Sequence, residues 1–207
     1  VSLIERWAAD AAVSICCTTY NHEPYITQAL EGFLMQETDF PIEILIHDDA
    51  STDGTAEIIR SYKLRHSDLI KPIYQTENQY SKGVKPTATF NLPRARGRYV
   101  ALCEGDDYWT DPHKLQKQVE YLEKHPECSM CFHNAINLQP DGSSQDYVRR
   151  FGIEIKPEYF LEDILTRNFI PTCSVVFRNN LIDELPQEAY ETPAMDILLY
   201  VILAQKG

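Results

Sequence analysis

The sequence predicts an α/β protein in which a mixed, mostly parallel sheet is flanked by helices. Short apolar runs of strand length alternate along the chain with stretches whose apolar residues recur at helical spacing, and this alternation is typical of α/β sheets. The run at residues 42–47 is nearly continuous in Ile and Leu, as expected of a buried parallel strand. Hydrophobic residues make up 43% of the 207 residues, which is enough for a sizeable core.

The first half of the chain shows the alternation most clearly. Apolar runs of strand length occupy residues 13–18, 42–47, 70–75 and 99–103. Pro24 follows the first run and precedes apolar residues at helical spacing, and proline is favoured in the first turn of a helix. Asp53 can cap the helix after the second run. A third helical stretch, at residues 87–95, stops before Gly97 and leads into the fourth strand.

The second half begins with a clear helix and then becomes less regular. Thr110 or Asp111 can cap this helix, with Pro112 at its first position, and an apolar stripe follows at helical spacing. A strand is expected at residues 128–134. Beyond it the pattern predicts a polar loop, a short helix, a strand and an apolar helix, at residues 139–150, 160–165, 173–177 and 194–204. This half is expected to complete the sheet that the first half begins.

The charge of the chain excludes several classes of partner. Its formal net charge is −12, so a surface for nucleic acid or an anionic membrane, which needs basic patches, is not expected. No apolar run is as long as a membrane span, and no basic-then-apolar secretory signal opens the sequence. A nucleotide ligand remains compatible with this charge because a bound metal ion can supply positive charge.

The six cysteines are expected to be core thiols of a protein in a reducing compartment. Most of them lie inside apolar stretches, without the spacing of a disulfide framework. Cys128 and Cys131 form one C-x-x-C pair with His133 nearby, but a single pair is a weak zinc signal. Core packing is therefore the favoured interpretation of this pair as well.

The acidic segment Glu104-Gly105-Asp106-Asp107 is the most informative feature of the chain. It directly follows the strand predicted at residues 99–103. Carboxylates this close repel one another, and a cation among their oxygens relieves the repulsion. Mg²⁺ and Mn²⁺ prefer oxygen ligands and often bridge to phosphates. The alternative is a solvated turn that caps the next helix, but Thr110 and Asp111 already serve as caps, so the segment predicts a metal–phosphate site.

Two further polar segments follow predicted strands, at residues 18–21 and 48–51. If the strands are parallel, all three strand ends lie along one edge of the sheet, where open α/β sheets bind ligands. Residues 49–54 superficially resemble a calcium loop, but Arg60 stands where that loop requires a bidentate Glu. The chain has no glycine-rich phosphate-binding loop, so phosphates must be held by a metal and by side chains.

These three motifs together resemble those of family 2 glycosyltransferases. They lie at residues 13–21, 46–55 and 97–109, and the resemblance is strong over residues 12–135 and weaker beyond. The family has the Rossmann-like GT-A fold, and its members are inverting enzymes that use nucleotide sugars. The resemblance implies that residues 13–135 form the nucleotide-sugar-binding half and that residues 136–207 complete the same domain on the acceptor side. Residues 1–12 would be an N-terminal extension, and a truncated C-terminus is expected because the family usually continues further.

The resemblance assigns donor-binding roles to the first two motifs. Thr18 and Tyr20 match the positions that hold the nucleotide base. Asp49 matches the aspartate that accepts a hydrogen bond from the base, and Asp48 lies beside it.

The third motif matches the family segment that holds the ribose and a divalent metal, Mn²⁺ or Mg²⁺. The chain has Glu104 where aspartate is commoner in the family, so we place the metal on Asp106 or Asp107 and leave the choice between them open. Lys82 and Arg94 are the candidates for contacting the diphosphate, although most basic residues in this region are expected to be solvated surface charges.

Inverting transfer also needs a base that takes the proton of the acceptor hydroxyl. In the family this base lies far downstream near the start of a helix, and the segment at residues 192–200 is similar to that region, which makes Asp196 the candidate. The alternative is that Asp196 only complements the positive end of its helix dipole. Asp183 and Glu184 are weaker rivals for the role of the base.

The sequence thus predicts a metal-dependent inverting glycosyltransferase. It would move a sugar from a nucleoside diphosphate sugar, expected to be a UDP-sugar, to a saccharide or lipid-linked acceptor in the synthesis of bacterial surface polysaccharide or glycolipid. A cytoplasmic location, peripheral to the inner face of the membrane, is expected for such an enzyme. The alternatives are a nucleotidyltransferase, which would usually carry a glycine-rich basic phosphate loop, and a transferase-like binding module without catalysis.

Overall fold

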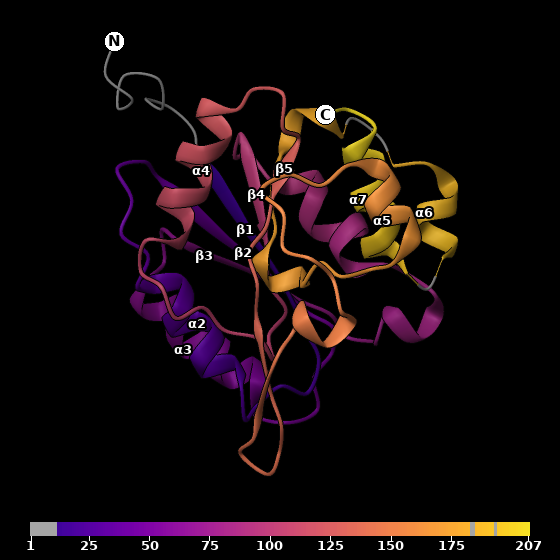
Figure 1. Cartoon of the computed structure of the whole chain (residues 1–207). Helices are drawn as coiled ribbons and strands as arrows, with labels where there is room; N and C mark the ends of the chain where they lie inside the picture. The colour runs from indigo at the N-terminus through magenta and orange to yellow at the C-terminus, as the bar shows by residue number, and fades with distance from the viewer. Residues whose placement is uncertain (1–11, 183–184, 193) are drawn as a thin grey trace.

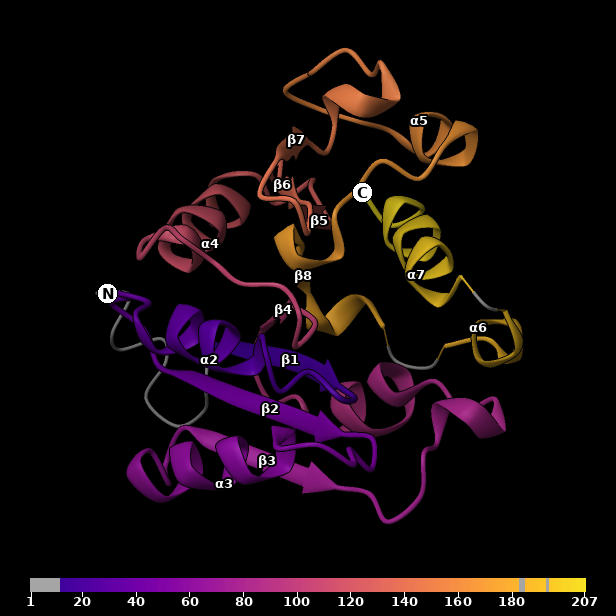
Figure 2. The same cartoon turned by 90° about the horizontal axis from the view of Figure 1, so that it is seen from below.

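A computed structural model describes residues 12–182, 185–192 and 194–207 of the chain. Its centre is a six-stranded sheet with helices on both faces (Figure 1). The same two helical layers are seen from below in Figure 2. The predicted N-terminal extension lies outside the described residues except for Ala12. Within the described residues, no helix is both long enough and apolar enough to cross a membrane.

The sheet is mixed and mostly parallel, which confirms the predicted fold class. Its strands are β1 Val13–Thr19, β2 Ile42–Asp48, β3 Ile70–Tyr74, β4 Tyr99–Leu102, β5 Met130–Cys131 and β8 Val176–Arg178. They are arranged in the order β3-β2-β1-β4-β8-β5. β1 pairs in parallel with both β2 and β4, and β3 pairs in parallel with β2, whereas β8 is antiparallel to β4 and β5.

Helices cover both faces of the sheet. α2 (Ile26–Leu34), α3 (Thr55–Arg65) and α4 (Lys114–Lys124) lie on one face, as Figure 1 shows. The opposite side carries α5 (Leu161–Thr166), α6 (Gln187–Glu191) and α7 (Met195–Ala204).

Each face of the sheet has its own hydrophobic core, because successive side chains of a strand point to opposite faces. In β1, Ile15 and Cys17 join the core under α2, α3 and α4, whereas Cys16 joins the core under α5 and α7. All six cysteines are free; three of them are buried, and Cys128, Cys131 and Cys173 pack against the first core. The predicted role of the cysteines in packing agrees with these positions.

Two predicted strands and a predicted loop of the second half differ from the structure, and the helix predicted to begin at Pro112 begins at Lys114 instead. Only Met130–Cys131 of the strand predicted at residues 128–134 is paired. The strand predicted at 173–177 is β8, which begins at Val176 because the 3-10 turn Thr172–Ser174 precedes it. The polar loop predicted at 139–150 contains part of a hairpin, whose strands are β6 Ile136–Leu138 and β7 Ser144–Asp146.

The hairpin has a local cause that apolar periodicity does not reveal. Gly142 adopts a φ of 82°, in the left-handed region that favours glycine, and the turn is closed by hydrogen bonds between Gln139 and Ser143 and from Gly142 to Gln139. An Asp-Gly pair at the tip is a common hairpin signal, but the flanking strands are too polar to look like strands.

The helix predicted at residues 87–95 is irregular. It consists of a π-helical turn, Thr87–Asn91, followed by a 3-10 turn, Leu92–Arg94. Pro93 cannot donate a backbone hydrogen bond, so a regular helix cannot continue through it.

At the edge of the sheet opposite the strand-end loops, a buried carboxylate joins three chain segments. Glu43 of β2 accepts hydrogen bonds from Lys71 Nζ (2.6 Å), Ser14 Oγ (2.6 Å) and the backbone N–H of Arg96 (2.9 Å). Burial alone would raise the pKa of Glu43, but these hydrogen bonds and the Lys71 charge outweigh it, so the pKa is lowered. The ionised carboxylate therefore stabilises the folded chain.

Replacing Glu43 with Gln should lower the free energy of unfolding at pH 7 by about 1–3 kcal/mol, because a hydrogen-bonded charge is lost from a buried position. The lowered pKa means that this contribution is full above the pKa of the unfolded chain and disappears as the pH falls through the folded value. Urea denaturation at pH 7 and pH 3 should show a difference that shrinks in acid. The matched control Glu57→Gln, on the exposed face of α3, should change stability little. An equal loss at both pH values would contradict this account.

Candidate functional site

Three loops meet at the carboxyl edge of the sheet. They follow β1, β2 and β4, which are neighbours in the sheet and run in the same direction. Backbone hydrogen bonds join them: Asp49 N–H donates to Thr19 O (2.9 Å), and Gly105 N–H donates to Thr18 O (3.0 Å). The three polar segments singled out in the sequence are thus adjacent in space.

The first two loops are held together by side chains that cross between them. Asn21 Oδ1 accepts from the backbone N–H of Thr52 (2.8 Å), and Glu23 Oε2 accepts from the backbone N–H of Gly54 (2.8 Å). Asn21 and Ala50 both have positive φ, at 54° and 63°. Asparagine tolerates this conformation, but it is unfavourable for alanine, so the loop after β2 holds Ala50 under backbone strain.

The two aspartates at the end of β2, Asp48 and Asp49, are buried and accept hydrogen bonds from the loops around them. Asp48 accepts a hydrogen bond from Ser51 Oγ (2.5 Å); burial raises the pKa of Asp48, and the bond from Ser51 partly offsets this. The carboxylate oxygens of Asp49 accept backbone N–H groups of Gln79 (2.8 Å) and Tyr80 (3.0 Å). Asp49 therefore fixes the loop after β3 against the end of β2.

The acidic segment after β4 carries the most perturbed carboxylate of the site. The Glu104 side chain is reached by water but is crowded by protein atoms, and this desolvation, with the charges of Asp106, Asp107 and Asp196, raises its pKa to about 7. Burial and then the Asp106 charge raise the pKa of Asp107, while a hydrogen bond with Cys173 opposes the change. Negative charge is thus concentrated at one point of the sheet edge.

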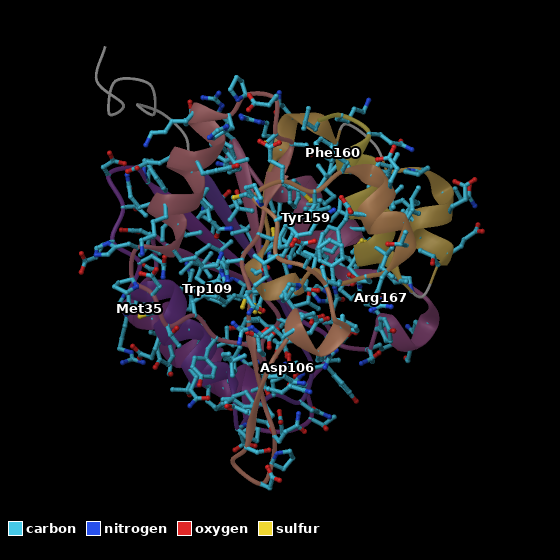
Figure 3. The ribbon with its side chains drawn as sticks, viewed as in Figure 1. Met35, Asp106, Trp109, Tyr159, Phe160 and Arg167 are labelled. Carbon is cyan, nitrogen blue, oxygen red and sulfur yellow. The ribbon has the colours of Figure 1, made fainter. Side chains whose placement is uncertain are left out.

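Two polar atoms beside the acidic segment have no hydrogen-bond partner within the described chain. They are Thr19 Oγ1 and His22 Nδ1, and both are buried. A Cβ atom at Gly105 would lie 2.6 Å from Thr19 Oγ1 and 3.0 Å from His22 Nδ1, so glycine lets the segment approach them closely. His22 Nδ1 lies 3.8 Å from Asp106 Oδ1. Asp106 itself is labelled in Figure 3.

A divalent metal would find carboxylate oxygens at this edge of the sheet, but no preformed cage among the described residues. In the part of the chain that the structure describes, no group of three or more His, Cys, Asp and Glu side chains could hold an ion. Neither does any Lys or Arg there form an ion pair with Glu104, Asp106 or Asp107. Among the described residues, the basic side chain beside these carboxylates is His22, 3.8 Å from Asp106. Carboxylate oxygens without a Lys or Arg partner are ligands of the kind that hard divalent ions prefer.

Asp196 lies in the first turn of α7, the helix that packs on the other face of the sheet from α2, α3 and α4. Its charge contributes to the raised pKa of Glu104, so the structure brings the predicted base toward the predicted metal segment. Asn168 Nδ2 donates a hydrogen bond to Asp196 Oδ2 (3.3 Å). The rival candidates for the base, Asp183 and Glu184, lie outside the described residues.

The other predicted donor-binding residues have different surroundings. Thr18 Oγ1 lies 3.0 Å from Thr87 Oγ1, and Tyr20 is exposed. Lys82 is exposed and pairs with Glu77.

Arg94 is engaged with the sheet. Its guanidinium donates to the backbone carbonyls of Lys71 (2.7 Å) and Ile46 (2.8 Å) and to Asn91 Oδ1 (2.8 Å). These contacts give Arg94 a bracing role on β2 and β3. Because its guanidinium is already engaged there, Arg94 is not proposed as a ligand of the diphosphate.

Trp109 anchors the segment that follows the acidic cluster. It is buried, and its ring meets Phe33 of α2 edge-on at a centroid distance of 4.9 Å. Its Nε1–H donates to Cys173 O (2.7 Å), and Lys114 Nζ lies 4.1 Å from the centre of the ring. Trp109, labelled in Figure 3, thus packs inside the fold rather than presenting its ring to a ligand.

Comparison with known proteins identifies the family. The profile described as Glycosyl transferase family 2 matches residues 14–184. The chain belongs to glycosyl transferase family 2. An uncharacterized Mycobacterium tuberculosis protein, Rv1520, is 45% identical over 175 residues, which are 84% of this chain and 49% of that protein. Bacillus subtilis TuaG is 30% identical over 94% of this chain and 73% of its own length. TuaG is described, provisionally, as a teichuronic acid biosynthesis glycosyltransferase.

Solved structures show the same fold. Staphylococcus aureus TarS (residues 1–349) in complex with UDP-GlcNAc has a TM-score of 0.67 and 25% identity, over 93% of this chain and 52% of that one. The Pyrobaculum calidifontis mannosyltransferase PcManGT, in complex with GDP-Man and Mn²⁺, has a TM-score of 0.63 and 20% identity, over 93% of this chain and 55% of that one. This family 2 chain therefore has the GT-A fold. It spans about half the length of Rv1520 and of both solved structures.

Replacing Ala50 with Gly should stabilise the chain by about 0.5–1 kcal/mol, because glycine adopts a positive φ without the steric cost that alanine meets. The control Ala56→Gly, in the first turn of α3, should instead destabilise by a similar amount because the helix favours alanine. Thermal and urea unfolding measure both changes. If Ala50→Gly destabilises the chain as much as the control, the loop after β2 does not hold alanine under strain.

Proposed function

We propose that this family 2 domain transfers a sugar from a UDP-sugar to an acceptor hydroxyl with inversion, assisted by Mn²⁺ or Mg²⁺. The observation that carries the proposal is the gathering of Glu104, Asp106, Asp107 and Asp196, without a pairing Lys or Arg among the described residues, beside two other strand-end loops. The UDP-GlcNAc held by TarS and the GDP-Man and Mn²⁺ held by PcManGT support a nucleotide-sugar donor and a divalent ion. Family membership favours this reading over a nucleotidyltransferase.

In the proposal, the loops after β1 and β2 receive the nucleotide base. Thr18 lies at the end of β1 and Tyr20 in the loop after it, and Asp48 ends β2 and Asp49 begins the loop that follows. The hydrogen bonds from Gln79 and Tyr80 fix the Asp49 carboxylate in one orientation, and each of its oxygens can still accept another hydrogen bond. A carboxylate fixed in this way suits a donor group on the edge of a base. Lys82 is the remaining candidate for the diphosphate once its exposed pair with Glu77 opens.

The metal would be held by Asp106 or Asp107, with Glu104 toward the ribose. The bound ion would supply positive charge that stabilises the nucleoside diphosphate as it leaves. The chain's own contribution is orientation: Asp107 N–H donates to Glu104 O (3.2 Å), and Cys103 Sγ lies 3.7 Å from Asp107 O. These contacts fix the backbone that carries the side chains of Asp106 and Asp107.

Asp196 is proposed as the base. Inverting transfer is a single displacement at the anomeric carbon: the acceptor oxygen forms the new bond while the bond to the diphosphate oxygen breaks. The Asp196 carboxylate takes the proton of the acceptor hydroxyl. Asp196 lies within electrostatic reach of Glu104 but on a different element from the proposed metal ligands, which supports a role distinct from metal binding.

The acceptor is proposed to be a saccharide or a lipid-linked saccharide of a bacterial surface polysaccharide. The provisional role of TuaG in teichuronic acid biosynthesis supports this class. The expected place of action is the cytoplasmic face of the membrane, where nucleotide sugars and lipid-linked acceptors meet.

The variants Asp106→Asn and Asp107→Asn should weaken Mn²⁺-dependent binding of UDP. At a UDP concentration of 100 times the dissociation constant, the wild-type chain should gain about 2.7 kcal/mol of stability, and at least one variant should lose most of this gain. Thermal shift with UDP, with and without Mn²⁺, measures the effect. Asp39→Asn, on the exposed loop before β2, is the matched control and should behave like wild type. If both site variants show the same UDP-induced thermal shift as wild type in Mn²⁺, the proposed metal site is wrong.

Asp196→Asn should leave UDP-GlcNAc binding unchanged but reduce turnover by about 10²–10⁴-fold, as expected when a general base is removed. Turnover can be followed as UDP released from UDP-GlcNAc in the presence of Mn²⁺, with water as the acceptor. Release at a rate near that of wild type would show that Asp196 is not the base, whatever the fate of the metal site.

A further inference from the structure

Asn168 connects the proposed base to a rigid part of the second core. It lies just beyond the end of α5 and is half-buried. Its Nδ2 donates to Asp196 Oδ2 (3.3 Å), and its Oδ1 accepts the backbone N–H of Ile170 (3.3 Å). Both ends of the amide are therefore used, one on the base and one on the backbone. Figure 1 shows α5, the helix before Asn168, beside α7, the helix of Asp196.

The backbone that orients Asn168 is firmly anchored. The next two residues, Phe169 and Ile170, are 2% and 1% exposed and belong to the second core. The Phe169 ring also contacts those of Tyr159 and Phe132, at centroid distances of 4.8 Å and 5.8 Å. Because its oxygen is tied to Ile170, the Asn168 amide has its N–H group directed at Asp196 before any ligand binds.

We infer that Asn168 is a positioning residue that holds the Asp196 carboxylate ready to receive the acceptor proton. This inference rests on the proposed role of Asp196 as the base. A carboxylate in the first turn of a helix can rotate about its side-chain bonds, and one hydrogen bond from a fixed donor reduces that freedom. Misplacement of a catalytic group by about 1 Å can lower the rate of an enzyme about a hundredfold.

The hydrogen bond is made to one oxygen of the group that must take the acceptor proton, because Asn168 Nδ2 donates to Asp196 Oδ2. The Asp196 charge acts on two titratable groups, Glu104 from the segment after β4 and Tyr200 one turn further along α7. Both are acids, so neither brings positive charge to Asp196. Among the described residues, Asn168 supplies a hydrogen-bond donor to the Asp196 carboxylate.

The variant Asn168→Asp separates the two hydrogen bonds of the amide. An aspartate oxygen can still accept the N–H of Ile170, so the backbone support remains, but an ionised carboxylate cannot donate to Asp196 and places a second negative charge beside it. Asn168→Ala removes both bonds without adding charge. Asn180→Ala, at an exposed asparagine in the turn Asn179–Leu181, is the matched control.

The experiment measures UDP release from UDP-GlcNAc with Mn²⁺ across pH 5–9, together with the affinity for UDP, for wild type, the three variants and Asp196→Asn. We expect Asn168→Asp to lower kcat about tenfold or more with UDP affinity within about twofold of wild type. The acidic limb of its kcat profile should move up by about one pH unit, because the base must be ionised and the added charge opposes ionisation. Asn168→Ala should lower kcat with a smaller shift, and Asn180→Ala should match wild type.

Two different results would overturn the inference, and they are distinguishable. If Asp196→Asn abolishes UDP release but Asn168→Asp keeps the kcat and the acidic limb of wild type, Asp196 is the base and Asn168 does not position it. If Asp196→Asn releases UDP at the wild-type rate, the proposed base itself is wrong and Asn168 has no base to position.

Discussion

The parallel pairing of β1 with both β2 and β4 is the constraint on which the site depends. Parallel neighbours end at the same edge of a sheet, so the loops that follow these three strands must lie together. The hydrogen bonds from Asp49 and Gly105 to the end of β1 continue this pairing past the strands themselves. Most polar side chains of the candidate site are carried by these three strand ends and their loops. Lys82 comes from the segment after β3, and Asn168 and Asp196 approach from the other layer.

The same constraint concentrates negative charge that no Lys or Arg of the described residues pairs with. Glu104, Asp106 and Asp107 are brought to one point, and the pKa of Glu104 rises to about 7 as a result of crowding and repulsion. Nearby basic residues are engaged elsewhere: Arg94 braces the sheet, and Lys82 pairs with Glu77. A site that concentrates carboxylates in this way is unfavourable for a free diphosphate and favourable for a diphosphate that arrives with a metal ion.

Much of this arrangement could be predicted from the sequence, because it depends on local patterns. The strands before the three loops are continuous apolar runs, and the polar residues that follow them are unmistakable. The antiparallel β8 could not be predicted in its place, since its position between β4 and β5 is set by contacts that are distant in sequence. Asn168 carries no motif, and its contact with Asp196 depends on how α5 and α7 pack. Similarly, Arg94 looks like a phosphate ligand in sequence until its partners on β2 and β3 are seen.

The central claim is that the acidic segment binds the diphosphate only together with a divalent cation. Isothermal titration of UDP into the wild-type chain at pH 7.5, once with Mn²⁺ and once with EDTA, tests it most directly. The account predicts that UDP binds with Mn²⁺ and at least about tenfold more weakly in EDTA, because the carboxylates then repel the diphosphate. Equal affinity under the two conditions would contradict it.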